Sequence, residues 1–169
     1  MPAIQLLSTA ALLIRGAAVD CLDSVPCIEI VGVDGSGASQ PCCCSTSGAS
    51  GVLRIEWSGV IDLDPTGQRS LDGSVCDHAY LASWRVLMLR CRPSIQDSGA
   101  APDPAVVSAQ DSLTAAEGWR VMSALTLRLP IVSPRNGWVV NDLSAVHQES
   151  CVGWSLRVDH LLQMCAPVC

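Results

Sequence analysis

The chain has no lysine and no phenylalanine, and all ten of its basic residues are arginine. Both biases are typical of a GC-rich genome. Charged residues make up only 15% of the 169 residues, and the net charge is −6. A surface that holds nucleic acid by neutralising phosphates needs the opposite balance. The glycine-rich segment 34–37 also has neither the lysine nor the following helix of a phosphate-binding loop.

An export signal is not recognisable in residues 1–22. No basic segment precedes the apolar run, and Asp20 does not fit a small-residue cleavage site before Cys21. The apolar run is also too short to span a bilayer. Because disulfide-stapled domains are typical of exported proteins, we expect an intracellular protein without a membrane segment. Its ten cysteines should then be mostly reduced thiols.

Paired cysteines with the spacing of zinc ligands are scarce, since no Cys-x-x-Cys occurs. Buried thiols that act as small apolar side chains are the simpler interpretation. A disulfide from Cys27 to one cysteine of the triplet 42–44 is an alternative. We expect no metal and no cofactor, although a zinc site could draw on these residues: Cys42, Cys43, Cys44, Cys76, His78, Cys91, Cys165 and Cys169.

A catalytic constellation is also lacking. Nucleophilic catalysis needs a base beside the nucleophile, but His78, His147 and His160 lie far apart in the sequence. We interpret all three as solvated residues at strand ends. A carboxylate cluster could form from four aspartates, although a wet strand face explains them better: Asp62, Asp64, Asp72 and Asp77. The sequence therefore predicts a protein that is not an enzyme.

Hydrophobic periodicity predicts a helix at 4–22, strands at 27–33, 52–64 and 80–91, a helix at 106–129, and strands at 138–140 and 151–160. Asp103 and Pro104 form a good helix start, as N-cap and first helical residue. The strand 80–91 becomes apolar on both faces towards its end, which is typical of an interior strand.

Two sequence patterns also predict which side chains share one face of a strand or a helix. Alternation in 52–64 places five residues on one dry face, with Gly59 as a possible bulge: Leu53, Ile55, Trp57, Ile61 and Leu63. The helix 106–129 has one apolar stripe, interrupted by Arg120: Val106, Ala109, Leu113, Ala116, Ala124 and Leu127.

Hairpin-linked strands followed by a helix predict an α+β fold. We expect a mostly antiparallel sheet of four to five strands, an N-terminal helix, and one long helix after the third strand. The whole chain, 1–169, should form a single domain with a long loop at 34–51 and a proline-rich hinge at 94–104. Nearly half of the residues are apolar, so some apolar surface should face partner subunits.

Several segments, taken in this order, resemble the neck proteins of long-tailed, non-contractile phages of actinobacteria. They are the cysteine cluster before the Leu-x-Ile-x-Trp strand at 53–57, the strand end from Trp84 to Pro93, the proline-rich hinge, the alanine-rich helix, and the closing segment 151–158. The element order also looks like the tail-terminator fold. The region 130–150 departs from the pattern.

The resemblance implies structural work in the virion, at the neck of the tail, after assembly in the host cytoplasm. A tail terminator forms a homo-oligomeric ring, typically a hexamer, on the major tail tube protein and stops its polymerisation. It joins the tube to the head-to-tail connector or stopper, and genomic DNA passes through its lumen without sequence-specific binding. Two alternatives remain: another neck component, such as a stopper or adaptor, and a cysteine-rich zinc-binding or redox-active cytoplasmic protein.

Overall fold

The computed structural model of the chain describes residues 3–32, 51–62, 78–91, 101–129, 137–148 and 151–164, and only the backbone at 3–7, 62, 78–79 and 162–164. These ranges contain two helices and five strands. Their order is α1 (Ala3–Val19), β1 (Ile28–Gly32), β2 (Val52–Asp62), β3 (His78–Cys91), α2 (Pro104–Arg128), β4 (Gly137–Gln148) and β5 (Cys151–Met164).

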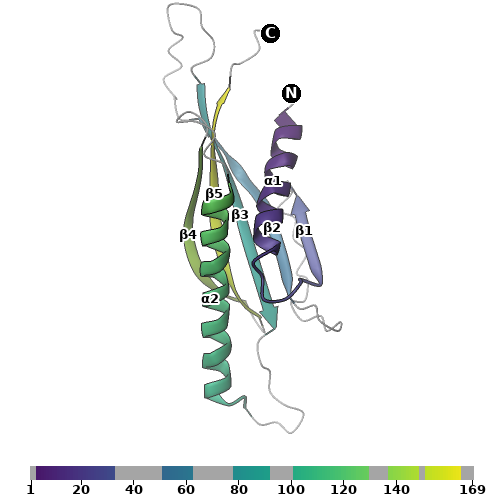
Figure 1. Cartoon of the computed structure of the whole chain (residues 1–169), viewed down its shortest axis with the longest axis vertical. Coiled ribbons are helices and arrows are strands. Elements are labelled where there is room, and N and C mark those ends of the chain that lie inside the picture. Colours follow the sequence, from purple (N-terminus) through teal and green to yellow (C-terminus); the bar gives the residue numbers. More distant parts are fainter. Residues whose placement is uncertain are drawn as a thin grey trace, which may run out of the picture.

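The five strands form one sheet in the order β1-β2-β3-β5-β4. β1 runs parallel to β2, and every other neighbouring pair is antiparallel. β3 lies between β2 and β5, as its apolar faces predicted. The predicted α+β fold, with an N-terminal helix and a helix after the third strand, is therefore confirmed (Figure 1).

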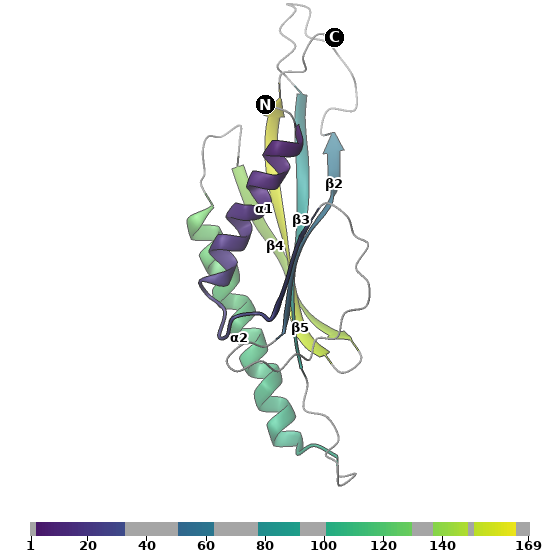
Figure 2. The ribbon, with the colours of Figure 1, turned by 90° about the vertical axis from the view of Figure 1, so that its right-hand side faces the viewer.

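Both helices cover the same face of the sheet (Figure 2). α1 contacts β1 and β2, whereas α2 contacts β4 and β5. We call this covered surface the helix face and the opposite surface the far face. The core lies between the helices and the helix face, and its largest fully buried apolar side chains include Ile14, Leu53, Ile55, Trp84, Met88, Leu125, Trp154 and Leu156.

The start of α2 agrees with the sequence prediction. Asp103 is the N-cap, and its side chain accepts a hydrogen bond of 2.8 Å from the backbone N–H of Ala105. Pro104 occupies the first helical position, where its missing N–H costs nothing. Further along, Gly118 allows α2 to approach the sheet closely. A Cβ at this position would lie 2.9 Å from Trp154 Cγ, so any larger residue would push the helix away.

A bulge in β2 overturns one of the predicted faces. The register with β3 shifts between Trp57 and Gly59, and Gly59 has a φ of 144°. The extra residue reverses the alternation, so Val60 takes the helix face and Ile61 turns to the far face. Ile61 pairs with Leu81 and is 54% exposed. The bulge at Gly59 was predicted correctly, but the single dry face from Leu53 to Ile61 was wrong.

The last two strands are longer than the sequence predicted. β4 continues to Gln148 instead of ending at 140, and β5 continues to Met164 instead of ending at 160. The reason in β4 is a second bulge between Asn141 and Ser144, where Asp142 has a φ of 55°. This bulge hides the alternation that would have shown one continuous strand.

Several predictions fall on residues outside the described ranges. These are the loop from 34 to 50, most of the hinge 94–104, and the residues Cys42, Cys43, Cys44, Leu63, Asp64, Asp72, Cys76, Asp77, Cys165 and Cys169.

Candidate assembly surface

A buried carboxylate ties four parts of the fold together. Glu117 of α2 is fully buried, and its Oε2 accepts hydrogen bonds from Arg90 Nε at 3.1 Å and Trp154 Nε1 at 3.2 Å. Its Oε1 accepts from the Arg90 guanidinium and, at 2.9 Å, from the backbone N–H of Asp23. Glu117 thus connects α2 to β3, β5 and the α1–β1 connection.

Arg90 completes this network from the strand side. It is 7% exposed and lies on the helix face of β3. Its second terminal nitrogen donates a 2.7 Å hydrogen bond to Ser24 Oγ. Because breaking a buried, hydrogen-bonded ion pair leaves a charge without solvent, this network fixes the α1–β1 connection against α2. We assign it a structural role, since both charges are already paired with each other.

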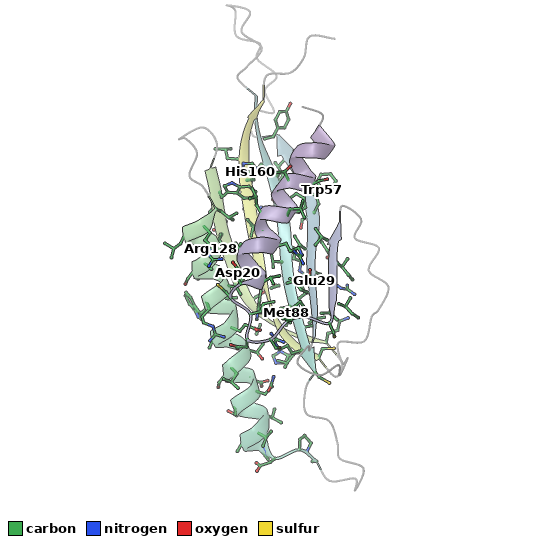
Figure 3. All side chains as sticks on the ribbon, turned by 45° about the vertical axis from the view of Figure 1, so that its right-hand side comes forward. Asp20, Glu29, Trp57, Met88, Arg128 and His160 are labelled. Carbon is green, nitrogen blue, oxygen red and sulfur yellow. The ribbon has the colours of Figure 1, made fainter. Side chains whose placement is uncertain are left out.

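Two exposed ion pairs join the end of α1 to α2. Arg128 donates a 2.6 Å hydrogen bond to Asp20 (Figure 3). Arg120 forms the second pair with Asp23. Exposed pairs of this kind contribute about 1 kcal/mol or less to stability. They line an open groove of about 700 Å³ between α2 and the residues that follow α1, and its apolar lining includes Leu22, Trp119 and Leu127.

The apolar stripe of α2 faces outward. The residues that pack against the sheet are instead Thr114, Glu117, Gly118, Val121 and Leu125. The large side chains of the stripe are highly exposed: Val106 is 52%, Leu113 60% and Leu127 85%. Outside the stripe, Trp119 is 60% exposed. The apolar stripe was predicted correctly as a sequence pattern, but in the single chain its side chains face outward and do not pack on the core. Contiguous exposed apolar surface is typical of interaction sites, so the stripe is the candidate surface for contact with another molecule.

The far face has a polar centre. Asp159 accepts hydrogen bonds from Ser83 at 2.7 Å, from Arg157 Nε at 2.8 Å and from Asn141 at 3.2 Å. The Asp159 carboxylate raises the pKa of the Arg157 guanidinium. Beside this cluster, Ser144 and Ser155 share a hydrogen bond of 2.9 Å. Arg157, Ser144 and Ser155 line a hollow of about 240 Å³ on this face.

Arg85 lies in the same hollow and differs from the other described arginines. Those others each form an ion pair: Arg15, Arg54, Arg90, Arg120, Arg128 and Arg157. No carboxylate within the described ranges pairs with the exposed Arg85. Its neighbour on β2, Glu56, pairs with Arg54 instead, and its neighbour on β5 is Arg157. Like charges directly opposite on neighbouring strands are destabilising, so Arg157 disfavours Arg85 at this position instead of pairing with it.

The histidines differ in their environments. His147 is exposed, as predicted, while only the backbone of His78 is described. His160 is half-buried and stacks on Trp138, with ring centroids 3.8 Å apart and planes within 3° (Figure 3). Burial lowers the pKa of His160. The prediction of a solvated strand end is therefore wrong for His160, because β5 continues beyond it.

The redox state of the cysteines contradicts another prediction. Cys27, Cys91 and Cys151 are disulfide-bonded, and among the described cysteines only Cys21 is a free thiol. Mostly reduced thiols were therefore the wrong expectation for this part of the chain. Cys91 also cannot supply the thiolate that its place among the zinc candidates required. Cys91 and Cys151 are register partners at one end of the sheet, close to Cys27, whose N–H bonds to Gly51 O at 3.1 Å.

Sequence reasoning missed the two residues that stand out most. Glu117 follows two alanines on a helix and reads as a solvated charge, and only its spacing from Thr114, Val121 and Leu125 places it on the buried side. Arg85 alternates with buried Trp84 and Val86, which predicts exposure but not the lack of a partner.

Comparisons with known proteins add no family. No family model and no curated protein matches the chain. Within the described residues, neither helix is long and apolar enough to cross a membrane, and no group of three or more histidine, cysteine or acidic side chains is placed to hold a metal ion.

Proposed function

We propose that this protein is a structural component of the neck of a long-tailed phage: a tail terminator that forms a ring on the tail tube. The ring caps the tube, stops its polymerisation and joins it to the head connector. This proposal starts from the sequence resemblance, and the observation that supports it most is the exposed apolar stripe of α2. A chain that leaves Leu113, Trp119 and Leu127 in solvent is suited to pack against other subunits.

The disulfides are compatible with a virion protein. Disulfides are rare in the reducing cytoplasm but persist on virions, which leave the cell. A neck subunit could be synthesised and assembled with reduced thiols, and Cys27, Cys91 and Cys151 could form their bonds after release. A redox-active cytoplasmic protein would instead keep its reactive cysteines exposed and reducible.

The test is the mass of the purified protein in solution, with and without the tail-tube protein, followed by negative-stain imaging of large species. We expect closed rings, either alone or on the ends of tubes. Leu127→Glu should prevent this assembly and leave the folded monomer intact, because Leu127 is 85% exposed in the single chain.

Thr126→Glu is the matched control, since it adds the same charge at the neighbouring exposed position of α2. A wild-type chain that stays monomeric and does not respond to tube protein would overturn the proposal. Assembly that is equally insensitive to both substitutions would remove α2 from the interface.

A further inference from the structure

The far face, which neither α1 nor α2 covers, has two arginines side by side near its centre (Figure 2). Arg85 of β3 and Arg157 of β5 are register partners, so their side chains emerge next to each other on the same face. Arg157 donates hydrogen bonds to Asp159 at 2.8 Å and to Ser83 at 3.2 Å. Arg85 is exposed and pairs with no carboxylate of the described ranges. One cation of the two is therefore neutralised and the other is not.

Both arginines line the hollow of about 240 Å³ on this face. Its lining also includes three serines and one carboxylate: Ser58, Ser144, Ser155 and Asp142. Ser144 and Ser155 share a hydrogen bond of 2.9 Å, in which only one of the two hydroxyl groups donates. The other hydroxyl hydrogen is left to donate to a ligand. The hollow thus brings hydroxyl donors together with the guanidinium that has no counter-charge.

The charges around the hollow indicate which class of ligand fits. The pKa of Arg157 is raised by its hydrogen bond to Asp159 and by the charge of Asp159, and last by the charge of Asp142. Two carboxylates therefore already act on the two arginines. A doubly charged phosphate would be repelled by both carboxylates. A single carboxylate instead matches the one cation that is not neutralised, and both of its oxygens can accept from the planar guanidinium of Arg85.

Exposed apolar side chains lie on the strands that flank the two arginines. Ile61 on β2 and Val139 on β4 belong to the far face, and they are 54% and 51% exposed. The hollow itself is smaller than the usual small-molecule pocket of about 300–1,000 Å³, so a free carboxylate would be enclosed poorly. Arginine is enriched among the residues that dominate protein interfaces. The surface therefore suits a carboxylate that belongs to another protein and arrives with apolar neighbours.

The described part of the chain has few carboxylates to offer to a second copy. Asp103 caps α2. Six other carboxylates are paired with arginines of their own chain: Asp20, Asp23, Glu29, Glu56, Glu117 and Asp159. A different protein is for this reason the better source of the ligand.

From this arrangement we propose that the far face binds an acidic segment of another protein, and that Arg85 holds one aspartate or glutamate carboxylate of that segment in the hollow. Hydroxyl groups of the lining serines donate to the same carboxylate. Apolar residues beside the acid cover Ile61 and Val139. An anion between the two guanidiniums also offsets the repulsion between Arg85 and Arg157. The proposal does not depend on the ring, because the far face and the apolar stripe of α2 lie on opposite sides of the molecule.

A peptide selection followed by titration tests the site. A random peptide library displayed on yeast is sorted for binding to the whole wild-type chain and, separately, to Arg85→Gln. We expect the wild-type chain to enrich peptides with an aspartate or glutamate beside apolar residues, and Arg85→Gln to enrich none of them. The most enriched peptide is then synthesised in three forms, with the acid, with the matching amide and with phosphoserine in its place.

Fluorescence anisotropy measures the affinity of each form. The acid form should bind about tenfold or more tightly than the amide form, because a hydrogen bond to a charged group is lost with the amide. Arg85→Gln should weaken binding of the acid form by a similar factor. Ser144→Ala should weaken it less, since it removes a neutral donor. Arg15→Gln is the control that should keep full affinity, because it removes a half-exposed arginine from α1 on the other side of the sheet.

Circular dichroism establishes that each variant is folded. The proposal is overturned if no acidic peptide is enriched, if acid and amide bind equally, or if Arg85→Gln keeps the affinity of the wild-type chain. Tighter binding of the phosphoserine form would assign the hollow to a phosphate group instead. A loss of self-association in Arg85→Gln, without an effect on peptide binding, would make a second copy the occupant. None of these results bears on the ring, which the solution mass and the α2 variants test separately.

Discussion

Two arginines on the same strand show how differently the two faces of the sheet are used. Arg90 and Arg85 lie on β3 an odd number of residues apart, so their side chains emerge on opposite faces. Arg90 is buried and bonded to Glu117 and Ser24, whereas Arg85 is exposed without a described carboxylate partner. The helix face uses its charge to hold the fold together, whereas the far face leaves the charge of Arg85 in solvent.

The largest expected effect comes from breaking the helix-face pair. Glu117→Ala should destabilise the fold by about 3–5 kcal/mol, because Arg90 remains buried without its counter-charge. Trp154 Nε1 and the Asp23 N–H lose their acceptor as well. Urea denaturation followed by tryptophan fluorescence measures the change.

The double variant Arg90→Met with Glu117→Leu separates charge from packing. Apolar residues of similar volume often replace a buried ion pair with little loss, so the double variant should be clearly more stable than Glu117→Ala. If the double variant is instead the less stable of the two, the pair stabilises the fold through more than mutual neutralisation.

A smaller effect is expected from pH, again on the helix face. Burial beside Trp138 lowers the pKa of His160 below its ordinary value of about 6.5. Below that value the unfolded chain binds more protons than the folded chain, so the free energy of unfolding should fall as the pH drops from 7 through 6.5. His160→Gln should flatten this slope, whereas His147→Gln, at an exposed site, should keep it. If the unfolding free energy depends equally on pH in the wild-type protein, His160→Gln and His147→Gln, the lowered pKa of His160 is wrong.

The smallest effect on stability is expected at Arg85. Arg85→Ala should change the free energy of unfolding by no more than about 0.5 kcal/mol, as is usual for exposed positions without specific contacts. Removing one of two facing cations could slightly stabilise the sheet. A loss of more than about 1.5 kcal/mol in urea denaturation would mean that Arg85 has an intramolecular role and that the contrast with Arg90 is wrong.

The sequence was most informative where side-chain periodicity and backbone chemistry agree. The N-cap Asp103, Pro104 and the glycine at the β2 bulge were all identified, and so was the order of helices and strands. Local patterns of this kind act within a few residues and leave a direct trace in the sequence.

Predictions failed where the outcome depends on what a side chain meets across the fold. The apolar stripe of α2 was visible, but which side of the helix faces the sheet is decided by Gly118 and its fit against Trp154. The burial of Glu117 depends on Arg90, which lies in another element. At the bulges in β2 and β4 the alternation of side chains between the two faces of the sheet reversed, because the irregularity moves every later residue to the opposite face.

The irregularity at Asp142 has a consequence for the exposed edge of the sheet. β4 is a long strand at the edge of the sheet, and a flat edge of that kind can recruit strands from other chains into aggregates. The left-handed residue Asp142 and the bulge around it interrupt the edge near its middle. The interruption thereby protects β4 from pairing edge to edge with a strand of another chain.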